Sequence, residues 1–308
     1  MKKRIYIVTA LLVSALCVGC GNKKTESETE NKTSQTKNQT DTATPEDKDL
    51  ELQSITEADY TYDYTDDIKT DVDYVVSNSQ SIQDELKNID KITQKYSLLA
   101  ESAQTQGEMN VASQWLYAIW DTELNNLWSR FSSSADSETK ERVLTEQRNW
   151  IAMKDDVTSR YIGLPEENGS MYPLLKNSFL EEITMNRSYF LADELAKVKG
   201  EAFTMPEASE KYGVFVDNYG TDSVHSSLIT RQATDGNDTA DIFIFRRGGT
   251  QGTFIDNGNG ELAFTADDGN IKGIIKINGW DGATFEVTET TGVSPFDVGE
   301  KFEFPFVF

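Results

Sequence analysis

The chain has 308 residues, with 52 acidic against 29 basic side chains and a formal net charge of −23 at pH 7. A surface this acidic repels nucleic acid and anionic lipid, which argues against a nucleic-acid-binding protein and favours a cationic partner. Cys17 and Cys20 are the only cysteines and His225 is the only histidine. The chain beyond residue 20 therefore has no thiolate nucleophile, no disulfide and too few ligands for a zinc site.

The N-terminus has the composition of an export signal. Residues 2–4 are basic, and residues 5–18 are almost all apolar. This apolar run has the length of a secretory signal core and is shorter than the roughly 20 apolar residues of a membrane-spanning helix. It ends in a Cys-Val-Gly-Cys sequence that resembles the bacterial lipobox, with Cys17 where Leu is commonest. The resemblance implies cleavage before Cys20 and a lipid on the Cys20 thiol. An ordinary cleaved signal peptide is the alternative.

Residues 20–58 are mainly polar and contain almost nothing to bury. Such a segment cannot offset the entropy that it would lose on ordering, so it is predicted to be disordered. We therefore predict a signal peptide at residues 1–19, a lipid-anchored tether at 20–58, and a folded body on the extracytoplasmic face of the cell membrane. About 250 residues remain for that body, which suggests two domains of ordinary size.

Residues 80–200 repeat apolar side chains at steps of three and four, which places each set on one helix face. Asp136 and Ser137, followed by Glu138, predict a helix start, and the Gly-containing stretch 163–169 predicts a break. Because the breaks are short, an antiparallel helical bundle is predicted over residues 59–202. The sets are Ile82, Leu86, Ile89, Ile92 and Tyr96 in a helix over about residues 79–101; Leu116, Trp120, Leu124, Leu127 and Phe131; Val143, Gln147, Trp150, Lys154, Val157 and Tyr161; and Leu175, Phe179, Ile183, Arg187 and Leu191.

From about Phe203 the pattern changes to short alternating or β-branched runs, separated by Asn-Gly and Asp-Gly pairs that tolerate the positive φ of tight hairpins. The chain is therefore predicted to be an α+β protein of two domains, in which residues 203–308 form a small antiparallel β-barrel or sandwich of about eight strands. The runs are shorter than the 9 to 11 residues of a membrane-spanning strand, which excludes an outer-membrane barrel. They cover residues 212–216, 224–230, 241–246, 252–255, 261–265, 271–277, 283–288 and 301–308.

The last of these runs alternates Phe with other residues. Alternation in a strand predicts that its four Phe side chains lie on one face, and its other residues on the opposite face. The Phe residues are Phe302, Phe304, Phe306 and Phe308, and the others are Glu303, Pro305 and Val307.

The helical part contains three motifs at fixed spacing. They are Leu124-Asn125, then Gln147 to Trp150 with Lys154-Asp155, then residues 180–187, which include Thr184 and end at Arg187. This pattern resembles the lysozyme-inhibitor LprI-like family, which has Leu-Asn, Gln-x-x-Trp-x-x-x-Arg-Asp and Cys-Leu-x-x-Leu-Thr-x-x-Arg. The likeness covers roughly residues 110–196. It implies a helical domain of an exported lipoprotein and, as its partner, lysozyme.

The chain departs from the family pattern in two ways. Lys154 stands where the family has Arg, and Thr158 and Phe179 stand where it has two cysteines that look like a disulfide pair. The resemblance therefore implies that packing replaces the bridge in this chain. The C-terminal part looks like small β-modules appended to other bacterial lipoproteins.

No catalytic residue, metal site or cofactor is predicted. His225 lies in a strand-like run with no Gly-x-Ser-x-Gly elbow around any serine. Residues 235–241 begin like an EF-hand loop, but Ala240 stands where the turn glycine must be. Residues 256–261 also lack the spacing of a calcium loop, and hairpin turns account for both segments. A hydrolase using paired carboxylates remains an alternative, although nothing singles out a pair among the many acids.

The most distinctive set in the bundle is predicted to be part of a binding surface. Interhelical hydrogen bonds are the alternative, with Asp155 and Arg187 as an ion pair, since a buried charge persists only when paired. The set consists of Gln147, Trp150, Asp155, Thr184 and Arg187.

Together these features predict a non-enzymatic, membrane-anchored lipoprotein that binds a cationic protein such as lysozyme. The alternative is a lipoprotein that interacts with the cell envelope or holds a small ligand in a lipocalin-like barrel, because barrels of about eight strands can hold one small ligand.

Overall fold

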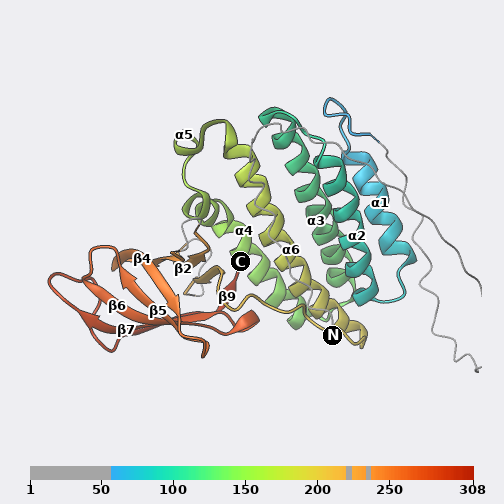
Figure 1. Ribbon diagram of the computed structural model, residues 1–308. Helices are drawn as coiled ribbons and strands as arrows, with labels where there is room; N and C mark the ends of the chain where they lie inside the picture. The colour runs from blue at the N-terminus through green and yellow to red at the C-terminus, as the bar shows by residue number, and fades with distance from the viewer. Residues whose placement is uncertain (1–56, 220–223, 234–236) are drawn as a thin grey trace, which may run out of the picture. The chain divides into compact units, whose positions relative to one another are not determined.

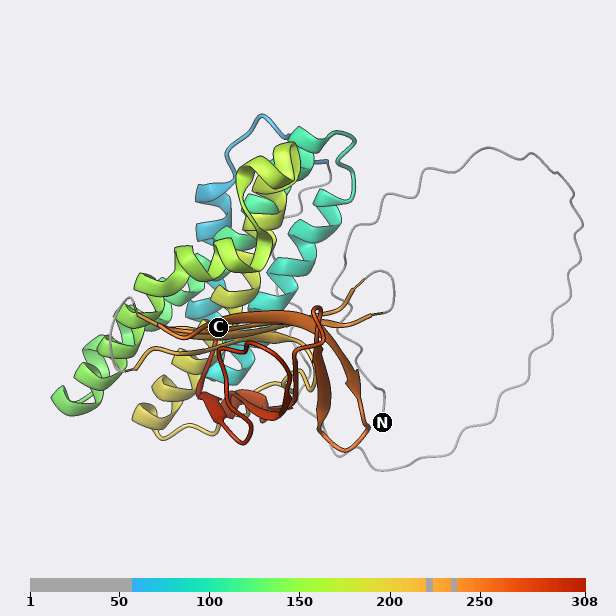
Figure 2. The same ribbon diagram turned by 90° about the vertical axis from the view of Figure 1, so that its left-hand side faces the viewer.

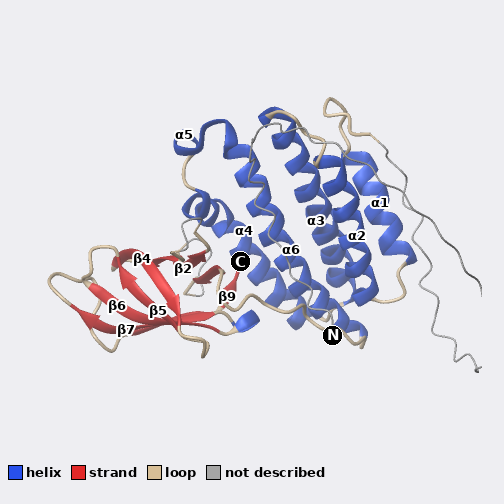
Figure 3. Cartoon of the chain, viewed as in Figure 1, coloured by secondary structure: helices blue, strands red, loops and turns tan. Residues whose placement is uncertain are grey.

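The computed structural model describes residues 57–219, 224–233 and 237–308. The predicted signal peptide, the predicted lipidation site Cys20 and nearly all of the predicted tether lie outside the described residues. Helices form the first part of the described chain and strands the second (Figures 1 and 3), which confirms the predicted α+β layout. In the described ranges, no helix combines the length and the apolar composition that a bilayer span requires.

The long helices form an antiparallel bundle (Figure 1). The most extensive helix–helix interface is that between α3 and α6, which together form the centre of the bundle. There the buried rings of Trp120 and Tyr189 pack with centroids 5.9 Å apart. The helical elements are α1 (Thr65–Asn78), α2 (Ile82–Ala100), α3 (Gln106–Ser134), α4 (Ser137–Ile162), the one-turn α5 (Pro165–Asn168), the 3-10 turn η1 (Gly169–Met171) and α6 (Tyr172–Lys199).

Side-chain caps fix where these helices begin. Asp136 accepts hydrogen bonds from the backbone N–H groups of Glu138 and Thr139, each at 3.0 Å, which confirms the helix start predicted there. At the start of α3, Thr105 and Glu108 form a reciprocal capping box. The predicted break after α4 is also confirmed, because α5 and η1 occupy it before α6 begins.

Helix α1 is a feature that the sequence analysis did not identify. Its buried apolar side chains are Ile68, Val72 and Val75, which have helical spacing. This set is short, and Asp66, Asp67 and other acidic residues lie around it. The composition of the segment is therefore that of a solvent-exposed loop. Packing of the three apolar residues against α2 and α3 stabilises the helix despite this composition.

The strands follow one another as an antiparallel meander. Their order in the sheet is β8-β7-β6-β5-β4-β3-β2-β1-β9. The predicted hairpin pairs lie between strands, and Gly258 and Gly269 have φ values of 76° and 72°. The strands are β1 (Gly213–Asp217), β2 (Ser226–Arg231), β3 (Thr239–Ile244), β4 (Gly248–Asp256), β5 (Leu262–Ala266), β6 (Ile271–Ile277), β7 (Ala283–Thr290), β8 (Lys301–Phe304) and β9 (Phe306–Val307), with a 3-10 turn η2 (Gly279–Asp281) before β7.

The C-terminal segment joins the two ends of the meander. Strand β8 pairs with β7, whereas β9 pairs with β1. The sheet therefore curls round to an almost closed barrel, with the C-terminal strands beneath the others in Figure 2. The described residues form nine strands rather than the eight predicted runs, because Pro305 has no backbone N–H and divides the last run in two.

Buried side chains fill the barrel interior. The largest of them are Phe215, Phe254, Phe264, Phe285, Phe296 and Phe304. Strands β3, β5 and β7 show the alternating burial of a sheet with one wet face. Strands β1 and β2 are instead buried on both faces. The outward-facing Val214, Val216 and Ile229 belong to the apolar core of the helices, so the barrel and the bundle share that core.

The prediction that four Phe side chains share one face is wrong. Phe304 lies in the barrel core, Phe306 is 38% exposed, and Phe308 lies in the core of the helices. Val307 instead packs against the barrel core. The interruption at Pro305 shifts the alternation by one residue, and a shift of one residue moves each following side chain to the other face.

Candidate binding surface

Two of the predicted binding residues form a polar contact between α4 and α6. Arg187 Nε donates a hydrogen bond to Gln147 Oε1 at 2.7 Å, and Arg187 Nη2 lies 3.9 Å from Glu146 Oε2. Burial lowers the pKa of Arg187 to about 10, while the carboxylates of Glu146 and Glu194 act in the opposite direction. The guanidinium therefore stays charged at neutral pH and is held in place by its acceptors.

Beside this contact, a small groove runs between the first half of α4 and the second half of α6. Arg187 and Glu146 line a cavity of about 220 Å³ together with Phe190. This volume is smaller than that of pockets for drug-sized ligands. Next to it an open depression of about 620 Å³ is lined by Arg142 and Glu194, which form an ion pair across the two helices.

Trp150 lies at the junction between the bundle and the barrel. Its ring is buried and stacks on Phe308 with centroids 6.0 Å apart. Lys154 lies over the ring of Trp150 at 4.9 Å and donates a hydrogen bond to Tyr117 Oη at 3.0 Å. Burial lowers the pKa of Lys154. The family motif residue Trp150 thus holds the last strand segment against α4.

The other two predicted binding residues lie apart from the Gln147–Arg187 contact. Thr184 is completely buried in α6, and Asp155 is exposed on α4. The suggested ion pair between Asp155 and Arg187 does not form. Asp155 is eight residues beyond Gln147, or about 12 Å along a helix, so it cannot reach the guanidinium that Gln147 holds.

The two positions where the family has cysteines are occupied by buried side chains. The Thr158 hydroxyl donates a hydrogen bond to the backbone carbonyl of Lys154 at 2.6 Å. Phe179 stacks on Tyr161 with ring centroids 4.2 Å apart. Aromatic packing between α4 and α6 therefore occupies the place where the resemblance implied a bridge.

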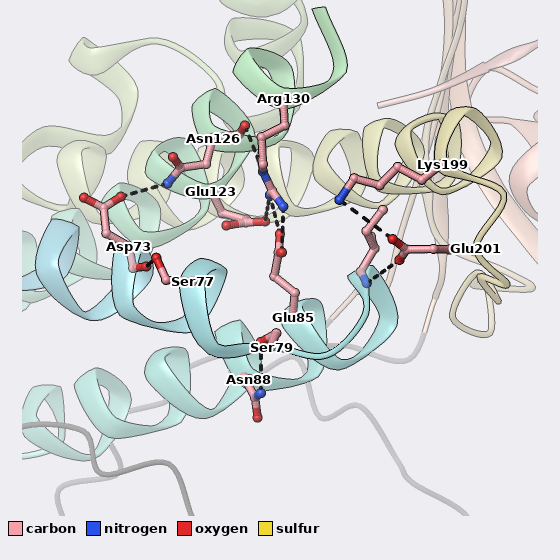
Figure 4. Close-up of polar contacts among 11 residues, drawn as sticks. Asp73, Ser77, Ser79, Glu85, Asn88, Glu123, Asn126, Arg130, Lys199 and Glu201 are labelled. Carbon is pink, nitrogen blue, oxygen red and sulfur yellow. Dashed lines mark hydrogen bonds and ion pairs between the residues drawn. The ribbon is translucent and has the colours of Figure 1, made fainter. Parts of the chain in front are cut away.

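A second polar cluster, inside the bundle, was not found from the sequence (Figure 4). Arg130 of α3 binds both carboxylate oxygens of Glu85 of α2, one of them at 2.8 Å. Glu123 of α3 is fully buried, and its Oε1 lies 3.7 Å from Arg130 Nη2. Burial, and then the charge of Glu85, raise the pKa of Glu123 well above its usual range. The signal in the sequence was an acid inside an apolar stripe, since Glu85 lies between Ile82 and Leu86.

Both carboxylate oxygens of Glu123 lack a hydrogen-bond donor among the described residues. A proton on Glu123 removes the negative charge and supplies a donor for the neighbouring Glu85. Asp73 of α1 adds further negative potential, and it accepts a hydrogen bond from Asn126 at 3.2 Å. The neutral form of Glu123 is therefore favoured, with Arg130 and Glu85 as the charged pair.

His225 lies where the barrel meets α4. It is almost completely buried, and its Nε2 is 3.2 Å from an Asp156 carboxylate oxygen. Asp156 also accepts a hydrogen bond from Arg160 at 2.9 Å, and the Arg160 guanidinium lies over the Phe243 ring. These contacts give His225 a structural role. Among the described residues, no group of three or more His, Cys, Asp or Glu side chains could hold a metal ion.

Comparison with known proteins assigns the central helices. Residues 99–191 match the model of a protein family described as Lysozyme inhibitor LprI. The helical unit therefore contains a segment that is similar to the LprI family. No curated protein and no solved structure matches the chain. The LprI segment comprises α3, α4, α5 and most of α6, so it includes the Gln147–Arg187 contact and Trp150 but neither α1 nor the barrel.

Proposed function

We propose that this chain is an extracytoplasmic lipoprotein, tethered through a lipid on Cys20, that binds and inhibits a cationic protein of the lysozyme class. The match of residues 99–191 to the Lysozyme inhibitor LprI family carries the proposal. Because that family is named for inhibition, we propose a binding role and not catalysis.

The distribution of charge supports a cationic partner. Residues 1–56 contain as many acidic as basic side chains, so residues 57–308 carry the whole net charge of −23. Complementary charge accelerates the encounter of two proteins and excludes wrong partners. A basic enzyme is attracted to such a surface, whereas nucleic acid and anionic lipid are repelled.

The packing of the barrel argues against a small ligand as the main partner. Phe264, Phe285, Phe296 and Phe304 are each at most 1% exposed and fill the interior. A lipocalin-like site needs an open cavity inside the barrel. We therefore assign the barrel a packing role against α4 and α6, and place partner binding on the helical unit.

The proposal is tested by lysozyme inhibition. The chain from residue 20 onward, with C20S, would be titrated into lysozyme at low and at physiological salt while muramidase activity is followed. We expect inhibition at micromolar concentration that weakens with salt but persists, since charge contributes to association and apolar contact maintains it. Full activity in excess protein at both salt concentrations would overturn the proposal. Inhibition lost at physiological salt would reduce it to nonspecific charge attraction.

A further inference from the structure

One end of the bundle combines acidic and apolar side chains. At this end α1, α3 and α6 begin, and α2 and α4 finish. We call it the acidic end and define it as residues 57–66, 98–110 and 163–172. These segments contain no Lys, Arg or His. Their acids are Glu57, Asp59, Asp63, Asp66, Glu101, Glu108, Glu166 and Glu167.

Hydrogen bonds join the three segments into one surface. Tyr60, ahead of α1, donates to the carbonyl of Leu99 at 3.2 Å and contacts Ser102 Oγ at 2.8 Å. Asn110 of α3 donates to the carbonyl of Ser170, in the connection before α6, at 3.0 Å. Figure 1 shows the start of α1, the α2–α3 connection and α5 at the same end of the bundle.

Apolar exposure is concentrated at the same end. Leu98, Tyr62, Leu164 and Met171 are 67%, 51%, 52% and 48% exposed. They are four of the six large apolar or aromatic side chains that the described helical unit exposes, the others being Tyr74 and Ile151. Large apolar side chains that are exposed at one end of an otherwise polar surface indicate a candidate protein-interaction site.

Helix stability accounts for only some of the acids. Asp63 and Glu108 accept hydrogen bonds from backbone N–H groups next to the starts of α1 and α3. Glu101 instead lies at the C-cap of α2, where the helix dipole disfavours negative charge. Glu101 and Glu166 accept no side-chain hydrogen bond among the described residues, so their charges face solvent.

The α4–α6 connection within this end has a fixed conformation. The Leu164 backbone N–H donates to Glu167 Oε2 at 2.8 Å, and Asn168 Nδ2 donates to the carbonyl of Ile162 at 2.7 Å. A loop held in this way loses little conformational entropy on binding. The exposed Leu164 and Met171 are therefore presented on a rigid projection.

We infer that the acidic end is the docking surface for the cationic protein, with Leu164, Met171 and Leu98 making apolar contacts and the carboxylates steering the partner. The inference rests on the proposed function. A positive charge on the partner complements the unopposed acids, while apolar contacts at the centre of an interface supply most of its affinity.

The experiment measures the Kd for lysozyme at physiological salt, using the chain from residue 20 onward with C20S. Leu164→Ser removes an apolar contact at the acidic end, and Ile255→Ser is its control on β4, where Ile255 is 71% exposed. E101Q/E166Q removes two charges at the acidic end, and E141Q/E286Q removes two exposed charges elsewhere. Circular dichroism verifies that each variant is folded.

We expect both variants of the acidic end to weaken binding about tenfold or more, which corresponds to about 1.4 kcal/mol each, and both controls to stay within about twofold of the parent. Equal affinity of the acidic-end variants and their controls would overturn the inference and leave the proposed function standing. A parent that does not bind lysozyme at all would overturn both.

Discussion

At the scale of the residue, the most unusual feature is the fully buried Glu123. It shares Arg130 with Glu85, although Arg130 hydrogen-bonds to the Glu85 carboxylate and not to that of Glu123. Two carboxylates beside one guanidinium leave an excess negative charge in the bundle if both ionise. Retaining a proton on Glu123 avoids that cost, since a buried charge without a partner is strongly unfavourable.

This arrangement predicts how stability depends on pH. The pKa of Glu123 is raised in the folded chain, so above its unfolded value of 4.5 the folded state binds more protons than the unfolded state. The free energy of unfolding then falls with rising pH, by at most about 1.4 kcal/mol per pH unit for one proton, until the folded pKa is passed. Glu123→Gln should remove this decline, and its stability relative to the parent should increase from about pH 4.5 upward.

Urea unfolding between pH 4 and 9 measures the effect. Glu85→Gln is the contrasting variant, because it deprives Arg130 of its bidentate partner; we expect it to lower the free energy of unfolding by about 3 kcal/mol at neutral pH. Parallel pH curves for the parent and Glu123→Gln would show that Glu123 titrates normally and contradict the prediction.

The sequence could predict polar contacts between residues in recognisable stripes, but not their partners. Gln147 and Arg187 lie in two such stripes and contact each other at 2.7 Å. Asp155 shares the family motif but lies too far along α4. Glu123 lies next to the stripe residue Leu124. Sequence periodicity does not reveal that the Glu123 side chain is buried beside Arg130, at the interface of α3 with α2.

At the scale of the element, periodicity predicted the β-runs well, because a strand with one buried face alternates. It predicted a barrel or a sandwich and could not decide between them, because closure involves the interruption at Pro305, after which β9 pairs with β1. Helix α1 was not predicted because its apolar stripe of Ile68, Val72 and Val75 is short. Tertiary packing stabilises the helix despite its acidic composition.

The interruption at Pro305 makes a testable prediction about the last strand segment. Phe304→Ala should cost about 3 to 5 kcal/mol, since its ring is fully buried in the barrel core. Phe306→Ala should cost less than about 1 kcal/mol, because that ring is partly exposed and leaves no enclosed cavity. Urea titrations of the two variants measure the difference. Equal losses would mean that both rings share the interior face, as uninterrupted alternation requires.

At the scale of the whole molecule, the helical unit and the barrel are joined through one apolar core. Phe308 stacks on Trp150, its carbonyl accepts a hydrogen bond from Asn186 at 2.9 Å, and the Trp280 ring packs edge-on against Phe190 of α6. The barrel thereby covers parts of α4 and α6, and it reaches the end of α4, where Arg231 of β2 donates a hydrogen bond to the carbonyl of Arg160 at 2.9 Å. Among the residues that the structure describes, these contacts involve none that belong to the acidic end, so a partner that docks there leaves them intact.

The last prediction concerns the anchoring that we propose for this molecule at the cell surface. Residues 57–308 carry the net charge of −23 and are repelled by anionic headgroups, so attachment has to come from the lipid proposed on Cys20. Two acyl chains are enough for stable anchoring. The Cys20 thiol can carry them through a thioether linkage, whereas the hydroxyl of a serine at this position cannot. The Cys20→Ser variant would be expressed at full length in a bacterium. We expect it to lack the lipid and to be lost from the membrane fraction, except for chains that keep the uncleaved N-terminal segment. Cys17→Ser is the matched control, because residue 17 belongs to the signal peptide that we propose is removed; this variant should remain on the membrane. Mass spectrometry of the N-terminus measures the lipid directly, and an unmodified Cys20 in the membrane fraction would refute lipid anchoring.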